Sequence, residues 1–139
     1  MRYLAIYRTV EKGVPPPPEH MAEMGKLIDE MTKAGVLLAT EGCRPSAQGL
    51  RVRRSGTKLT VTDGPFVETK EVIGGFALLE VKSREEALAW TKRFLLVAGD
   101  GESEVRQLFE SGDFSPEERA CGAGTHKETL VDAGGQTVV

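Results

Sequence analysis

Three side chains of this sequence are of the types that transfer protons, and they stand well apart along the chain. They are His20, Glu41 and Asp63. An imidazole or a carboxylate can act as a general acid or base when a neighbouring group orients it within hydrogen-bond reach of a substrate. We therefore treat the three as candidate catalytic residues, provided that the fold brings His20 near one of the two acids. The structural alternative for His20 is a place in the first turn of a helix.

The aspartate begins an unusual stretch, TDGPFVETKEVIGGF, at residues 62–76. Its carboxylate can accept hydrogen bonds from amides two residues ahead, and Pro65 favours an extended Gly64. Phe66 can anchor the loop in the core. These features indicate a turn that stabilises itself, and we favour this interpretation over a general base held at a cavity mouth. The later Gly74-Gly75 pair predicts a bulge or a close backbone approach to the other subunit or to a ligand.

Further polar and aromatic side chains are candidate substrate contacts. They are Tyr7, Arg44, Phe66, Glu68, Lys70 and Arg106. Tyr7 stands in an apolar strand, where its hydroxyl needs a hydrogen-bond partner. Either arginine could bind an anionic substrate, although both can instead be paired at a sheet edge. The ETKE run is a solvated surface unless Glu68 or Lys70 turns inward.

Composition argues against several classes of function. The formal net charge is −3, from 18 basic and 21 acidic residues, so we expect no nucleic-acid partner. The cysteines and histidines form no metal-ligand pattern, and we expect no metal ion and no cofactor. The N-terminal MRYLAIYRTVEKG is neither a signal peptide nor a membrane span. We therefore expect no membrane partner and a cytoplasmic location.

Hydrophobic periodicity and turn residues predict a simple order of elements. Strands are predicted at residues 2–8, 36–43, 50–54, 58–62, 73–81 and 104–110. One helix is predicted from Glu19 to Gly35 and a second from Ser83, which forms a capping box with Glu86, to Gly99. A further short helix is predicted after Ser115.

This order predicts an α+β fold of the ferredoxin-like βαββαβ type with an inserted β-hairpin. We expect one domain over residues 1–115 and a tail over residues 116–139 that is loosely ordered after its short helix. Both faces of the predicted sheet are apolar, whereas two helices can cover only one. We therefore expect a homodimer whose sheets pack face to face around a cavity. The alternative is that a loop or the tail covers the second face.

Four stretches of the sequence together resemble a known family. VTDGPFVETKEVIGGF at 61–76, TEGCRPSAQGLRVR at 40–53, SREEALAW at 83–90 and EVRQLF at 104–109 are similar to the YCII-related family, specifically its DGPF-domain branch. The resemblance covers about residues 1–115. It implies a dimeric α+β barrel of ferredoxin-like subunits, and most members of the family have no assigned activity.

The resemblance implies two kinds of function. Related YCII-type proteins carry a His-Asp pair in a cleft, and one relative is a dehydrochlorinase acting on a chlorinated hydroxyquinol. His20 matches the place of that histidine, whereas the second strand offers Glu41 and no aspartate. The first function is therefore binding of an unknown small molecule in a cleft of the homodimer, with cofactor-free acid-base chemistry of the lyase or isomerase type. The alternative is a non-enzymatic ligand-sensing or regulatory module, because other DGPF proteins are encoded near extracytoplasmic-function sigma factors.

Overall fold

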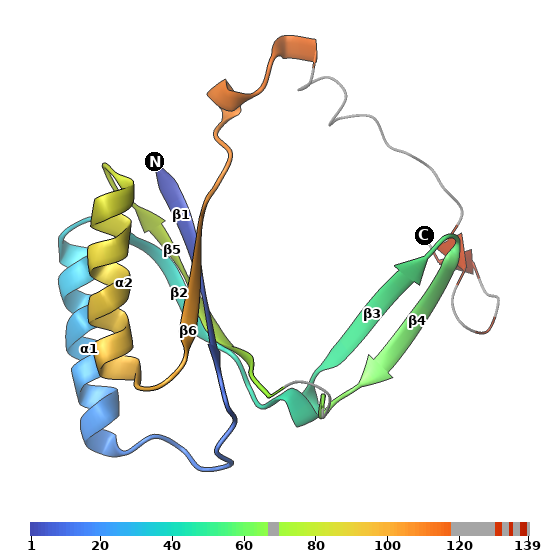
Figure 1. Ribbon diagram of the computed structural model, residues 1–139, viewed down its shortest axis with the longest axis horizontal. Coiled ribbons are helices and arrows are strands. Elements are labelled where there is room, and N and C mark those ends of the chain that lie inside the picture. The colour runs from blue at the N-terminus through green and yellow to red at the C-terminus, as the bar shows by residue number, and fades with distance from the viewer. Residues whose placement is uncertain (67–69, 118–129, 132–133, 135–136, 139) are drawn as a thin grey trace. The chain divides into compact units, whose positions relative to one another are not determined.

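The computed structural model describes residues 1–66, 70–117, 130–131, 134 and 137–138 (Figure 1). The chain forms two units, each with its own sheet. The first unit consists of Met1–Arg44 and Thr69–Glu110. The second consists of Pro45–Glu68 and Ser111–Val139.

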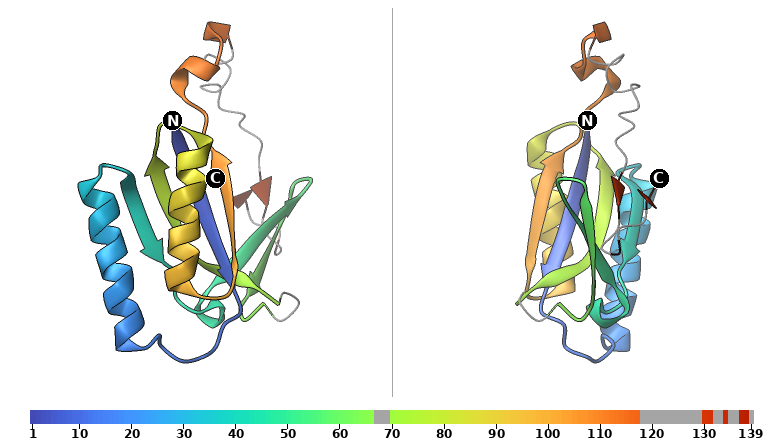
Figure 2. Two further views of the ribbon diagram at one scale, coloured as in Figure 1. Left: turned by 60° about the vertical axis from the view of Figure 1, so that its left-hand side comes forward. Right: turned by 90° about the vertical axis from the view of Figure 1, so that its right-hand side faces the viewer.

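The first unit has the predicted ferredoxin-like α+β arrangement. Its elements in chain order are β1 (Arg2–Thr9), α1 (Pro18–Lys33), β2 (Leu37–Gly42), β5 (Val72–Glu80), α2 (Arg84–Ala98) and β6 (Glu102–Gln107). The sheet has the strand order β2-β5-β1-β6, and all three strand pairs are antiparallel. Figures 1 and 2 show both helices side by side on one face of this sheet.

Local signals explain where the two helices begin and end. α1 has proline at its first position, where no amide is needed, and it ends before Gly35, whose φ of 73° suits glycine. At the start of α2 the Glu86 amide donates to the Ser83 hydroxyl oxygen at 3.1 Å. The Glu86 carboxylate in turn accepts from the Lys82 amide at 2.9 Å, so the predicted capping box is confirmed. Within the described ranges, every helix is too short or too polar to cross a membrane.

The core of the first unit lies between the helices and one end of the sheet. Its buried apolar residues are Tyr3, Leu27, Met31, Val36, Leu79, Val81 and Ala87. Tyr3 and Leu79 lie opposite each other in the β1–β5 pair and share the face that the helices cover. The other face carries the alternate residues of the same strands, and Phe76 on that face is 38% exposed.

The second unit contains the predicted hairpin, formed by β3 (Leu50–Ser55) and β4 (Lys58–Asp63). Pairing of Ser55 with Lys58 leaves a two-residue turn in which Gly56 has a φ of 61°. The short strands β7 (Leu130–Val131) and β8 (Thr137–Val138) continue this sheet, and the 3₁₀ turns Ser46–Gln48 and Ser111–Asp113 belong to the same unit.

The predicted helix after Ser115 is only partly described. Pro116 and Glu117 are helical, and the rest of that predicted helix lies outside the described residues. Most of the predicted tail beyond it also lies outside them.

Candidate functional site

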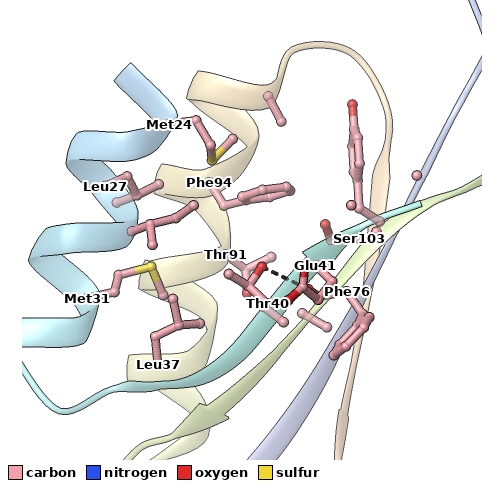
Figure 3. A pocket seen from close by; sticks show the side chains of 18 of the residues that line it. Met24, Leu27, Met31, Leu37, Thr40, Glu41, Phe76, Thr91, Phe94 and Ser103 are labelled. Carbon is pink, nitrogen blue, oxygen red and sulfur yellow. Dashed lines mark hydrogen bonds between the residues drawn. The ribbon is translucent and has the colours of Figure 1, made fainter. Parts of the chain in front are cut away.

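A cavity of about 580 Å³ lies in the first unit between the two helices and the sheet (Figure 3). Its walls are mainly apolar side chains of α1 and α2. Met24, Leu27 and Met31 project into it from α1, and Phe94 lines it from α2. His20, in the first turn of α1, also lines the cavity and is only partly exposed.

The cavity exists because the side chains of the sheet become smaller along the strands. Residues that lie opposite one another in neighbouring strands form rows across the face that the helices cover. The row in the packed core consists of the large residues Leu37, Leu79 and Tyr3. The next two rows are Thr40, Ala77 and Ala5, followed by Gly42, Gly75 and Tyr7. The side chains of the helices opposite these small residues are large, and they hold the helix layer away from the sheet. A space therefore stays open between the two layers.

Gly75 also allows the strands to approach closely. A Cβ atom at this position would lie 2.6 Å from the Glu41 carbonyl oxygen, which is too close for any other residue without a shift of β2. The neighbouring Gly74 lies where the register of the β1–β5 pair shifts. The predicted bulge is therefore confirmed at Gly74, whereas the close approach at Gly75 is to β2 of the same chain and not to another subunit or a ligand.

Tyr7 lines the cavity in the row of Gly75. Its ring packs edge-on against Phe94, with 5.3 Å between the ring centres and 83° between the ring planes. Its hydroxyl donates to the Asp100 carbonyl at 2.8 Å. The hydrogen-bond partner predicted for the Tyr7 hydroxyl is thus a backbone carbonyl.

The other hydroxyl groups of the cavity differ in whether they have a hydrogen-bond partner. The Thr40 hydroxyl donates to the Phe76 carbonyl at 2.9 Å, and the Thr91 hydroxyl donates to the Ala87 carbonyl at 2.8 Å. The Ser103 hydroxyl oxygen is buried and has no hydrogen-bond partner among the described residues. Ser103 lies opposite Tyr7 on β6 and lines the cavity.

Glu41 lines the cavity but does not pair with His20. The register of β2 shifts between Leu37 and Ala39, so Thr40 and Gly42 follow Leu37 on the helix side. Glu41 lies opposite Phe76, and strand alternation directs its side chain to the other face. Within the described part of the first unit, His20 makes no side-chain hydrogen bond or ion pair with Glu41.

The remaining predicted site residues lie elsewhere than the cavity wall. Asp63 ends β4 in the second unit and is exposed, and Phe66 lies in the same unit with the Arg51 guanidinium 3.9 Å above its ring centre. Arg44, Lys70 and Arg106 are exposed residues of the first unit that do not line the cavity. Glu68 lies outside the described residues.

The DGPF stretch packs as a turn within the second unit. The Gly64 amide donates to the Gly49 carbonyl at 2.9 Å, and a side chain at Gly64 would collide with the Ser46 carbonyl. The Phe66 ring lies against Gly49. These contacts form a turn through the backbone. The predicted hydrogen bonds from loop amides to the Asp63 carboxylate are not present among the described residues.

An ion pair joins the two helices beside the cavity. Arg93 of α2 donates two hydrogen bonds to the Glu30 carboxylate of α1, at 2.6 and 2.9 Å, and lies 4.9 Å above the ring centre of Trp90. The hydrogen bonds from Arg93 lower the pKa of Glu30 below its usual value. Among the described residues, no group of three His, Cys, Asp or Glu side chains could hold a metal ion.

Three contributors to the cavity were missed from the sequence. Met24 and Met31 lie on the helix predicted from Glu19 to Gly35, but the period of a helix says which face is covered and not how well it is filled. Ser103 stands between charged residues in the sequence and gives no local signal. The nearest available signal was the run of small residues at alternate positions, Ala5 on one strand and Gly75 and Ala77 on another.

Comparison with known proteins gives two matches. The chain matches the model of the YCII-related domain over residues 1–111. It is also 32% identical over 72 residues to an uncharacterized protein of Rhizobium meliloti (strain 1021), an overlap of 52% of this chain and 58% of the relative. The chain therefore covers little more than half the length of that relative.

Proposed function

Because the chain belongs to the YCII-related family and its first unit encloses an apolar cavity, we propose that it binds a small organic molecule between its helices and its sheet. The observation that carries this proposal is the cavity of about 580 Å³, left open by the small residues of the sheet. Small-molecule sites in proteins commonly measure roughly 300–1,000 Å³ and have mainly apolar walls. Membership in the DGPF-domain branch stays a prediction.

The proposed chemistry is proton transfer by His20 without a cofactor. His20 lines the cavity, so a bound molecule is within reach of its ring. An imidazole can take a proton from one atom of a ligand and return it to another, or remove a proton while a leaving group departs. These are the steps of an isomerase and of a lyase. Glu41 is proposed as the second proton carrier, a role that requires its carboxylate to reach the cavity side of β2.

Asp63 is left out of the proposed chemistry. It belongs to the second unit, whereas the cavity is formed by residues of the first unit. An Asp63→Asn variant therefore serves as the matched control for variants of His20.

The experiment is a screen of metabolites by thermal shift, followed by analysis of each hit for product by mass spectrometry. For a hit that is converted, we expect His20→Ala to lower the turnover number by about 100-fold or more, which is the usual contribution of a general acid or base. Asp63→Asn is expected to retain turnover. Unchanged turnover in His20→Ala would exclude His20 from the chemistry while leaving the binding site in place.

A second function is a ligand-sensing module without chemistry. It is favoured by one observation, that no hydrogen bond from the described residues orients the His20 ring. This function predicts hits that raise the melting temperature through binding and give no product. The same screen therefore separates the two functions.

We also propose a homodimer formed through the uncovered face of the first unit's sheet. On this face Leu4 lies opposite Leu78 and Ile6 lies opposite Phe76, so two apolar pairs stand side by side. An apolar face of this kind favours association in water. A second copy packed there would form a two-fold interface, for which about 1,000 Å² or more of buried surface is usual. The low number of cysteines, two in the chain, supports a cytoplasmic location.

A further inference from the structure

We infer that the ligand of this cavity is a mainly apolar molecule that has no anionic group and carries one hydroxyl or carbonyl group, and that this group forms a hydrogen bond with Ser103. The inference rests on the proposed small-molecule function and narrows its ligand class. It depends on three features of the cavity wall: its charge, its apolar surface and its one unpartnered hydroxyl.

The charge of the wall argues against an anionic ligand. Among the described residues that line the cavity there is no lysine and no arginine. Moving a carboxylate or phosphate from water into such a site is costly because, apart from the His20 ring, no side chain of the described wall can balance its charge. Arg106 does not supply this positive charge. Ser103 and Val105 share the face of β6 that the helices cover, so Arg106, the next residue, faces the other side of the sheet.

The apolar surface comes from side chains that adapt to a guest. Met24 and Met31 approach the cavity from α1, and Phe94 approaches from α2 (Figure 3). Methionine has three rotatable bonds and a polarisable sulfur atom, so it packs well against rings and irregular apolar shapes. Phe94 and the Tyr7 ring add flat surfaces. A ligand with an aromatic or compact apolar body fits these walls.

The hydroxyl of Ser103 supplies the specific contact. The hydroxyls of Tyr7, Thr40 and Thr91 already donate to backbone carbonyls. The Ser103 oxygen is buried, lines the same cavity and has no partner among the described residues. A buried hydroxyl without a partner costs free energy, and a ligand group that bonds to it removes this cost. Ser103 thus fixes the position of the polar end of the ligand.

The test uses three probes with the same ring system: 2-naphthol, naphthalene and 2-naphthoate. Their dissociation constants are measured by NMR titration for the wild type, for Ser103→Ala and for Ser55→Ala. The last variant removes the same hydroxyl from an exposed position of the second unit. We expect the wild type to bind 2-naphthol most tightly, naphthalene next and 2-naphthoate most weakly. Ser103→Ala is expected to weaken 2-naphthol by about 3- to 10-fold, the usual effect of one hydrogen bond, and to leave naphthalene unchanged.

The outcomes distinguish this inference from the function on which it rests. Preferential binding of 2-naphthoate would overturn the inference while leaving a small-molecule site in place. The same would follow if Ser103→Ala did not change the ratio of the 2-naphthol and naphthalene affinities, because the hydroxyl would then be satisfied by water. If none of the probes bound, both the inference and the proposed site would fail. Ser55→Ala should match the wild type for all three probes.

Discussion

Gly75 of β5 lies directly opposite Tyr7 of β1, on the face of the sheet that the helices cover. At this point the sheet carries a ring on one strand and no side chain on the next. The Tyr7 ring packs against Phe94 of α2, which keeps the helix layer away from the sheet. Gly75, on the strand beside this ring, leaves the space open. The cavity is therefore a consequence of side-chain size along two strands.

Replacing Gly75 with alanine should destabilise the protein. The added Cβ would lie 2.6 Å from the Glu41 carbonyl oxygen, so β2 must move away from β5. We expect a loss of about 1–3 kcal/mol in the free energy of unfolding, the usual cost of overpacking, measured by urea denaturation. The control is Gly25→Ala in α1, where a Cβ meets nothing within 4 Å. That variant should be neutral or more stable by up to about 1 kcal/mol, because alanine favours helix. Equal effects of the two substitutions would contradict the close approach at Gly75.

Filling the cavity should remove binding without unfolding the protein. Ala77 lines the cavity, and leucine at this position would extend into the open space. We expect Ala77→Leu to change the free energy of unfolding by less than about 1 kcal/mol, whereas leucine in a fully packed core would cost about 1–3 kcal/mol. Binding of 2-naphthol should be lost. A folded Ala77→Leu variant that binds the probe as well as the wild type would show that the probe binds elsewhere.

The ion pair between the helices should make stability depend on acidic pH. Arg93 lowers the pKa of Glu30 in the folded protein, so the unfolded chain binds more protons there than the folded one. The stabilisation is therefore present above the unfolded pKa of Glu30 and is lost as pH falls through the lower folded pKa. Glu30→Gln should flatten this part of a plot of stability against pH, measured by denaturant titration between pH 3 and pH 6.

The control for this substitution is Glu23→Gln, an exposed position on the same helix. It should leave the acid-side slope as in the wild type. The assignment to Glu30 would be wrong if both variants had the same slope.

A charge on the uncovered face of the sheet should dissociate the proposed dimer. Phe76 lies on this face opposite Ile6, and Phe76→Asp would place a carboxylate in the interface. We expect a dimer for the wild type and a folded monomer for this variant by analytical ultracentrifugation. Leu96→Asp is the control, since Leu96 on α2 is 86% exposed. A wild-type monomer at the concentrations used for the other measurements would exclude the dimer.

The fold could be predicted where local signals are strong. Ser83 and Glu86 specify the start of α2 by hydrogen bonds within a few residues, and the alternation around Gly75 and Ala77 specifies a strand. The ferredoxin-like order then follows from the sequence of elements. The division of the chain into two units could not be predicted, because it depends on contacts between residues far apart in the sequence rather than on local pattern.

The candidate site could be predicted only in part. Tyr7 and His20 were named from the sequence and both line the cavity. Glu41 or Asp63 was expected to orient His20. Glu41 also lines the cavity, but within the described part of the first unit it makes no hydrogen bond or ion pair with His20, and the register shift between Leu37 and Ala39 changes the alternation of β2 so that Glu41 lies opposite Phe76. A shift of one residue in a short strand leaves no clear mark in the sequence. Ser103 was missed because its importance lies in having no partner, which is a property of its surroundings.

The methionines of the cavity report directly on whether a ligand occupies the space between the helices and the sheet. The chain has four methionines, of which Met21, Met24 and Met31 line the cavity and Met1 does not. The measurement is a titration of protein labelled with ¹³C at the methionine methyl groups with 2-naphthol, followed by NMR. The account predicts that the signals of the three cavity methionines move together with one dissociation constant while that of Met1 stays in place. Saturable binding that leaves those three signals unmoved would contradict it.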